Sequence, residues 1–153
     1  MNWLSRLFGG KDDTSQPVTA VVQPQQPEPP QHDERPDEQF CISVPVRGGQ
    51  YNNRQAAIKR CVRGEQVQLV REPNNPHSQT GTSILICSLD GQELGYVPHE
   101  VSVSLAPIMD AGQGLRAEVD WTVRLDKEPR GKIHDLFKAS YGFGVAIRIG
   151  VLK

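Results

Sequence analysis

Alternating apolar and polar residues divide most of the chain after residue 39 into short strands. From Leu115 to Leu125 every odd position is apolar, and a period of two predicts a strand with one face in the core and the other in water. The same period predicts strands over Phe40–Val46 and Val145–Val151. Pro45 places the first of these at a sheet edge, because proline has no N–H to donate to a neighbouring strand.

Three shorter apolar runs predict the remaining strands. Val67–Val70 is one of them, and Ile84–Leu89 and Glu93–Val97 form a pair. This pair flanks Asp90-Gly91, a dipeptide typical of the tight turn in a β-hairpin.

A period of three to four residues predicts two helices. Arg54–Val62 carries an apolar stripe, with Asn53 as its N-cap and Gly64 as its end. A second helix precedes Gly112, and Pro107 kinks or shortens it because proline disrupts a helix interior.

These elements predict a mainly β fold with two helices. The connections are short and there is no β-α-β rhythm, so the roughly six strands favour a small, closed or nearly closed β-barrel. A loop with one turn of helix near Lys132–Lys138 precedes the last strand.

The first 39 residues differ in composition from the rest of the chain. Residues 14–39 hold six of the twelve prolines together with many glutamines, and such a stretch buries too little apolar surface to fold. We therefore expect a disordered tail over 1–39 and a folded domain over 40–153.

An apolar cluster lies near the start of this tail. The spacing of its four members predicts one face of a short helix that ends at Gly9-Gly10, and they are Trp3, Leu4, Leu7 and Phe8. Such a face could bind a protein groove or a membrane surface, and the alternative is a frayed end without a function, since an isolated helix this short is marginal.

Charge separates the tail from the domain. The chain carries a net charge of −1 over 153 residues, but residues 1–38 hold three basic and seven acidic side chains, and the remainder is +3. A mildly basic domain gives weak support to a polyanionic partner, and an ordinary solvated surface explains it equally well.

Other features of the sequence bear on location. No apolar run approaches the roughly 18 residues that cross a bilayer, and the N-terminus lacks the pattern of a secretory signal. Three widely spaced cysteines, Cys41, Cys61 and Cys87, match no disulfide framework, so we expect reduced thiols and a cytoplasmic, monomeric protein.

Catalytic and metal-binding patterns are missing from the sequence. There is no GxGxxG or phosphate-binding loop, and no cofactor is expected. Asp110 and Asp120 are expected at the surface and Cys61 in the core. The four histidines share no ligand spacing with the cysteines, which predicts no metal site; they are His32, His77, His99 and His134. These observations favour a binding module over an enzyme.

One stretch has an unusual composition. In Val70-Arg-Glu-Pro-Asn-Asn-Pro-His77 two prolines bracket two asparagines, which predicts a rigid loop that displays polar groups. With Gln50-Tyr-Asn-Asn-Arg-Gln55 before it and Leu94-Gly-Tyr-Val-Pro-His-Glu100 after it, the order and spacing closely resemble the HIRAN domain over about residues 40–123.

The resemblance implies an OB-like barrel with added helices that binds single-stranded DNA and holds its 3′ end in a pocket. Tyr51 matches a base-stacking position, Asn74 and Asn75 match the polar loop, and His77 matches a stacking or hydrogen-bonding position. Tyr96 matches a phosphate- or sugar-contacting position, and its alternative is packing in the barrel.

Basic residues complete the expected site. His99 falls where the family often has a basic residue. Contacts to the DNA backbone could come from four further cations, which are Arg54, Lys59, Arg60 and Arg71. Alternatively, Arg54 supports its helix and Arg71 pairs with a carboxylate.

The chain departs from the family at Ser78, where the resemblance implies a carboxylate that recognises the 3′-hydroxyl. This substitution affects end recognition more than general binding of a single strand. The sequence thus predicts a non-catalytic DNA-binding module in repair or replication. The alternative is a protein-interaction module that is tethered through its N-terminal apolar cluster.

Overall fold

The computed structural model describes residues 35–127, 130–139 and 141–153. Residues 1–34 of the expected disordered tail, which include its apolar cluster and His32, lie outside these residues, whereas the end of that tail is folded, since β1 begins at Glu38. Three antiparallel strands form the first sheet, in the order β1 (Glu38–Pro45), β6 (Phe143–Leu152) and β5 (Leu115–Arg124). The second sheet is also antiparallel, in the order β2 (Val67–Arg71), β3 (Ile84–Ser88) and β4 (Glu93–Tyr96).

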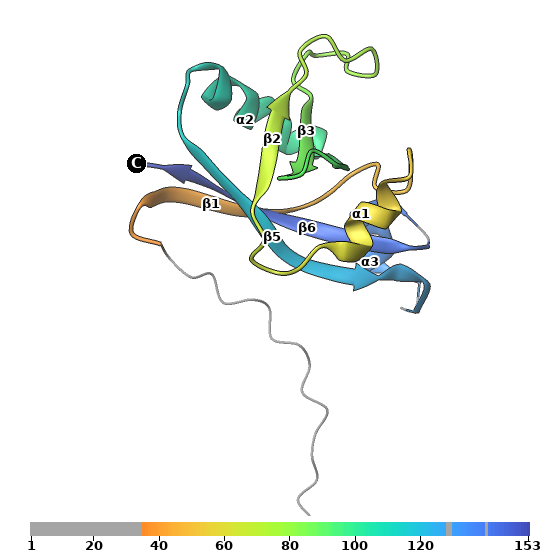
Figure 1. Cartoon of the computed structure of the whole chain (residues 1–153). Helices are drawn as coiled ribbons and strands as arrows, with labels where there is room; N and C mark the ends of the chain where they lie inside the picture. The colour runs from red at the N-terminus through yellow and green to blue at the C-terminus, as the bar shows by residue number, and fades with distance from the viewer. Residues whose placement is uncertain (1–34, 128–129, 140) are drawn as a thin grey trace, which may run out of the picture. The chain divides into compact units, whose positions relative to one another are not determined.

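The first sheet is organised around β6, which pairs with both neighbours along its length (Figure 1). Residues 144–151 are all buried, so the face in water that the period of two predicts is wrong for this strand, because a central strand can be covered on both faces. β1 lies at the edge, which confirms the position that Pro45 predicts.

The second sheet contains the predicted hairpin. Gly91 has a φ of 84° and donates its N–H to the carbonyl oxygen of Ser88 at 2.9 Å. Glycine adopts this left-handed conformation without steric cost, so the chain reverses here and β3 pairs with β4.

The two sheets meet at single bridges instead of forming a closed barrel. Arg47 and Tyr96 exchange two backbone hydrogen bonds of 2.9 and 2.8 Å, and Gln66 is bridged to Glu118. Gly95 makes the first bridge possible, because a Cβ there would lie 2.3 Å from the Arg47 carbonyl oxygen. β2 and β4 have only five and four residues, which is too few for them to pair continuously with the strands of the first sheet.

The described residues contain three α-helices, which are the two predicted ones and a short third one where the sequence predicts a turn of helix near Lys132–Lys138. They are α1 (Arg54–Arg60), α2 (His99–Asp110) and α3 (Lys132–Phe137), and a 3-10 turn, η1 (Leu125–Lys127), follows β5. The predicted cap of α1 is wrong, since Asn53 is left-handed, with a φ of 59°, and its side chain makes no capping bond. α2 continues through Pro107 to Asp110.

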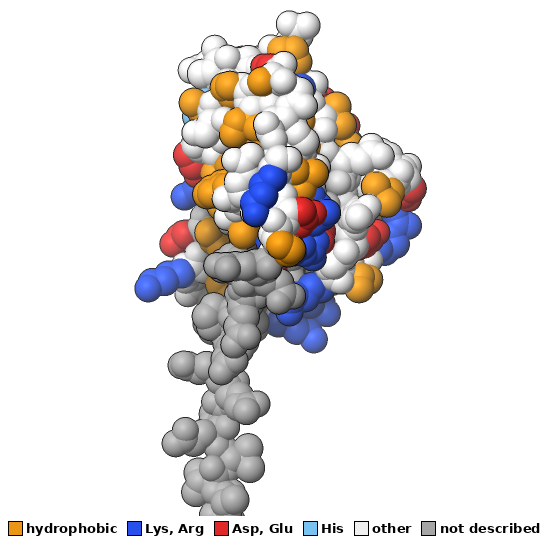
Figure 2. All heavy atoms as spheres, turned by 90° about the vertical axis from the view of Figure 1, so that its left-hand side faces the viewer, with side chains coloured by type: hydrophobic (Ala, Val, Ile, Leu, Met, Phe, Trp, Pro, Cys, Tyr) orange, Lys and Arg blue, Asp and Glu red, His pale blue; other side chains and the backbone are white. Residues whose placement is uncertain are grey.

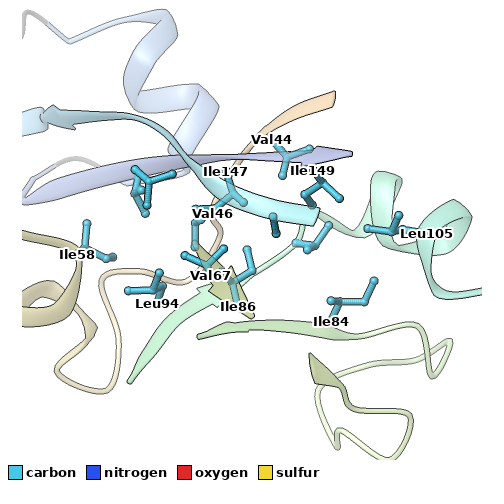
Figure 3. Close-up of a cluster of buried hydrophobic side chains, with 14 of the residues drawn as sticks. Val44, Val46, Ile58, Val67, Ile84, Ile86, Leu94, Leu105, Ile147 and Ile149 are labelled. Carbon is cyan, nitrogen blue, oxygen red and sulfur yellow. The ribbon is translucent and has the colours of Figure 1, made fainter. Parts of the chain in front are cut away.

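Aliphatic side chains from both sheets and from α1 and α2 form one core. Ile147 and Ile149 of β6 face Ile86 of β3 in its centre, with Ile58 of α1 and Leu105 of α2 at its margins (Figure 3). The period-two pattern therefore identified the buried face of the main strands.

Asp120 does not lie at the surface as expected. The register of β5 against β6 shifts between Val119 and Trp121, and Asp120 is only 7% exposed. A β-bulge inserts one residue into the pairing, so two consecutive side chains turn inward and the alternation of the sequence is broken at this point.

The thiols and Asp110 have ordinary structural positions. Asp110 lies at the surface in an ion pair with Arg71, as predicted. Cys61 packs against the core, and burial, reinforced by Glu65, raises its pKa to about 11. A thiol with so high a pKa is a weak nucleophile at neutral pH.

A buried ion pair joins the beginning of β1 to β6. The Glu38 carboxylate accepts hydrogen bonds of 3.1 and 2.6 Å from the Arg148 guanidinium, and the two side chains are 3% and 8% exposed. Gly150 leaves room for this carboxylate, because a Cβ there would lie 2.5 Å from it. The hydrogen bond with Glu38 raises the pKa of Arg148.

The surface around this pair carries both signs of charge. Arg116 pairs with Asp37, and Arg35 pairs with Glu118, each at 2.7 Å. On the face shown in Figure 2, basic and acidic side chains alternate and do not form one continuous basic patch.

We predict that Arg148→Met destabilises the domain by about 3 kcal/mol, because it leaves the buried Glu38 carboxylate with only its longer, 3.5 Å contact to Arg116. Arg124→Met is the matched control. The Arg124–Asp126 pair is exposed, so its loss should cost less than about 1 kcal/mol. Urea unfolding of both variants measures the difference, and equal losses would contradict a special role for the buried pair.

Candidate functional site

The loop between β2 and β3 is shaped by hydrogen bonds among its own residues. Asn75 donates its backbone N–H to the Glu72 carbonyl at 3.2 Å, and Ser78 donates to the Asn75 carbonyl at 2.9 Å. The side-chain oxygen of Asn75 accepts the backbone N–H of His77 at 2.9 Å. These bonds and the two prolines fix the loop conformation that the sequence predicts.

The side chains of Glu72, Asn75 and Tyr96 form a hydrogen-bonded cluster. The Tyr96 hydroxyl donates to the Glu72 carboxylate at 2.9 Å, and the Asn75 amide donates to the same oxygen at 2.8 Å. Burial and the neighbouring Glu72 raise the pKa of Tyr96. Its hydroxyl proton is therefore committed to Glu72, and its oxygen accepts a hydrogen bond of 3.2 Å from the Asn75 amide.

A cavity of about 380 Å³ opens beside this cluster. It brings together four of the predicted site residues, Asn75, His77, Tyr96 and His99. Hydroxyl, amide and apolar groups complete the lining, from Ser78, Gln79, Thr80, Ser83, Val97 and Ser102. We call this space the loop cavity. Two segments that are separated in sequence, residues 75–83 and 96–102, thus form one polar and aromatic pocket.

A second opening, of about 490 Å³, lies against the same loop. Asn74 lines it together with Glu72, Asn75, His77 and Tyr96. Glu72 was not predicted as a site residue. Its signal in the sequence is only its position in the Arg-Glu-Pro-Asn-Asn-Pro motif, and its contact with Tyr96 depends on the fold.

Arg54 supports the site from within the protein. It is 5% exposed, its guanidinium lies 2.6 Å from the Glu93 carboxylate, and it donates to the Gly48 carbonyl at 3.1 Å. The same guanidinium lies 5.1 Å from the centre of the Tyr96 ring. This agrees with the supporting role that the sequence leaves open.

Arg71 is likewise engaged in internal bonds. It pairs with Asp110 at 2.9 Å and donates to the carbonyls of Ser83 and Gly81 at 2.9 and 3.1 Å. It therefore holds the segment that closes one side of the loop cavity, which agrees with the predicted alternative of a carboxylate partner.

The structure separates Tyr51 from the other predicted residues. Tyr51 is exposed and lines a different cavity, next to α3. Lys59 and Arg60 are exposed on α1, where Lys59 lies over the Phe143 ring and Arg60 bonds Gln92. Contrary to what the family resemblance implies, Tyr51 therefore does not share a pocket with Asn75 and Tyr96.

Metal and membrane features are lacking in the described part of the chain. Residues 35–127, 130–139 and 141–153 contain no group of three His, Cys, Asp or Glu side chains that could hold a metal ion. None of the helices in these ranges has the length and apolar character needed to cross a bilayer.

Comparison with known proteins identifies the fold and the family. The model of the HIRAN domain matches residues 39–141, more than half of the chain. The chain belongs to the HIRAN family. HIRAN domains are known as DNA-binding modules. The structure resembles the HIRAN domain of human HLTF, with a TM-score of 0.50 and 20% identity over 72% of this chain and 74% of that chain.

A further solved structure is also similar to this HIRAN domain. It is a protein from Lactobacillus plantarum, with a TM-score of 0.47 and 21% identity over 72% of this chain and 99% of that chain. No curated protein matches the chain significantly. The resemblance found in the sequence is thus confirmed, and the family match extends beyond β5 into the segment that contains α3.

We predict that Glu72→Gln lowers the pKa of Tyr96, because it removes the negative charge that disfavours the phenolate. In the unaltered protein the raised pKa stabilises the fold below the unfolded-state value of about 10, and this stability is lost as the pH rises through the folded-state pKa. Glu72→Gln should therefore lose less stability at alkaline pH.

A carbon-13 NMR titration of the three tyrosines measures the shift, with Tyr96→Phe to assign the signal. An unchanged pKa of Tyr96 in Glu72→Gln would mean that the carboxylate does not control this hydroxyl.

Proposed function

We propose that this HIRAN domain binds single-stranded DNA and holds a 3′ end in the loop cavity. The observation that carries the proposal is the convergence of Asn75, His77, Tyr96 and His99 on one cavity of about 380 Å³. A volume of this order suits a small ligand or one terminal nucleotide.

Aromatic and imidazole rings suit the faces of unpaired bases. His77 is exposed at the tip of the loop, and stacking of a base on a ring contributes about 1–3 kcal/mol with little sequence preference. His99 lies at the N-terminus of α2, where its ring can donate to a phosphate or a sugar oxygen.

The hydrogen-bonding pattern favours a hydroxyl over a phosphate at the strand terminus. The Glu72 carboxylate is an acceptor, and it lines the second opening at the same loop, beside Tyr96. A 3′-hydroxyl can donate to such a group, whereas a terminal phosphate brings negative charge towards Glu72. The Glu72 carboxylate thus performs part of the role of the carboxylate that the resemblance implies at the position of Ser78.

The remaining assignments are proposals of the same kind. We place the start of the folded domain near β1, two residues before the predicted boundary at residue 40, and infer a non-catalytic role in DNA repair or replication in the cytoplasm. The three cysteines are free thiols, consistent with such a compartment.

We predict that His77→Ala weakens binding of a short 3′-hydroxyl oligonucleotide about 5- to 150-fold, the range expected from the loss of one stacking contact. His99→Ala should weaken it less and reduce its dependence on salt. Fluorescence anisotropy measures both. Arg63→Ala, an exposed cation on the turn between α1 and β2, is the control and should bind almost normally.

Absence of oligonucleotide binding by the unaltered protein would refute the proposed function. Equal weakening by Arg63→Ala would instead show a diffuse electrostatic interaction that does not use the loop cavity.

Ser78 lines the loop cavity at the position where the resemblance implies a carboxylate. Ser78→Asp should increase the preference for 3′-hydroxyl over 3′-phosphate ends, because it adds an acceptor and a negative charge beside the loop cavity. Competition between the two oligonucleotides measures the ratio, and Ser78→Asn, similar in size but neutral, is the control. If both variants change the ratio equally, charge at this position does not govern end selection.

A further inference from the structure

A cavity of about 450 Å³, separate from the two openings at the loop, lies between α3 and the segment after β1. Tyr51 lines it from one side and Tyr141 from the other, and these rings are 61% and 64% exposed. Two exposed aromatic rings at one cavity leave apolar surface in water, which is typical of a surface that binds a ligand. We call this space the tyrosine cavity.

The wall of the tyrosine cavity contains an unsatisfied polar atom. His134 is 8% exposed, and its Nε2 lies 2.9 Å from the carbonyl oxygen of Leu125. Among the residues that the structure describes, its Nδ1 has no hydrogen-bond partner and is buried. Because most buried polar atoms are paired, this nitrogen is an unusual feature of the residue that forms the wall.

One cation lines the tyrosine cavity. It is Lys138, which is exposed at the end of α3. Outside the lining, two residues after Tyr141, the Phe143 ring lies below two further cations, Lys59 at 5.8 Å and Arg124 at 5.6 Å, and Arg124 is paired with Asp126. Asp135 is the acidic residue of the lining. Aromatic rings combined with cations are typical of surfaces that bind single-stranded nucleic acid.

Arg47 connects this cavity to the loop cavity. Its backbone pairs with Tyr96, which lines the loop cavity. Its guanidinium donates to the Leu136 carbonyl and, at 3.5 Å, to the Asp135 carbonyl of α3. The side chain of Arg47 is also 25% exposed and lies 3.6 Å from the exposed Glu100 carboxylate, so a phosphate of a strand that passes from one cavity to the other would compete with Glu100 for its positive charge.

We propose that the tyrosine cavity is a second base-binding subsite, in which Tyr51 and Tyr141 stack on bases upstream of the nucleotide in the loop cavity. This inference rests on the proposed function. Lys138 and Arg47 contact the connecting phosphates. Nucleotides beyond the terminal pair then add affinity, with little dependence on base identity because every base has a stacking face.

The test measures affinity against length, using 3′-hydroxyl oligothymidines of two, four and six nucleotides in calorimetric titrations. The unaltered protein should bind the longest about 5-fold or more tightly than the shortest, and Tyr141→Ala should remove most of this gain. Tyr141→Phe keeps the ring and should retain the gain. Lys138→Gln should lower the salt dependence by about one ion for the longest strand only.

The outcomes distinguish the two proposals. Binding of two and six nucleotides with equal affinity, or equal weakening of both by Tyr141→Ala, would overturn the second subsite and leave the loop cavity intact. Failure of every oligonucleotide to bind the unaltered protein would overturn both. Because Tyr141 is exposed, its variants should fold normally, and thermal unfolding verifies this.

Discussion

The two backbone hydrogen bonds between Arg47 and Tyr96 determine how this protein is assembled. They join the chain after β1 to β4 and so connect the two sheets on one side. The close approach depends on Gly95, since any side chain there would collide with the Arg47 carbonyl. The same bridge places the Tyr96 ring at the loop cavity and directs the Arg47 side chain to α3, so both candidate subsites depend on it.

The interior of the site consists of charged groups that bond one another and the backbone. Arg54 and Arg71 hold the Tyr96 ring and the segment at residues 81–83 through internal bonds. Glu72 fixes the Asn75 amide and the Tyr96 hydroxyl. Such preorganised groups lose little entropy when a ligand binds, and this suits a module that must recognise a flexible single strand.

Much of the fold was predictable from local pattern. The alternation in β1, β5 and β6 and the turn at Gly91 identified the main strands, because successive side chains on a strand point to opposite faces of the sheet whatever the strand pairs with. The predicted cap at Asn53 was wrong, because asparagine also tolerates the left-handed conformation that it adopts here. The bulge at Asp120 was missed because it depends on the register against β6.

The sequence by itself determined the strands, the rigid asparagine-proline loop and the HIRAN family, since each depends on residues that are close together in the chain. Tertiary structure decided which residues meet. His99 and His77 line the same cavity, and the Tyr96 hydroxyl donates to Glu72. Arg54 and Arg71 form internal bonds. Tyr51 lines a cavity with Tyr141 and not with Asn75. Contacts of this kind depend on how the two sheets join, and no spacing along the chain encodes the geometry of that junction.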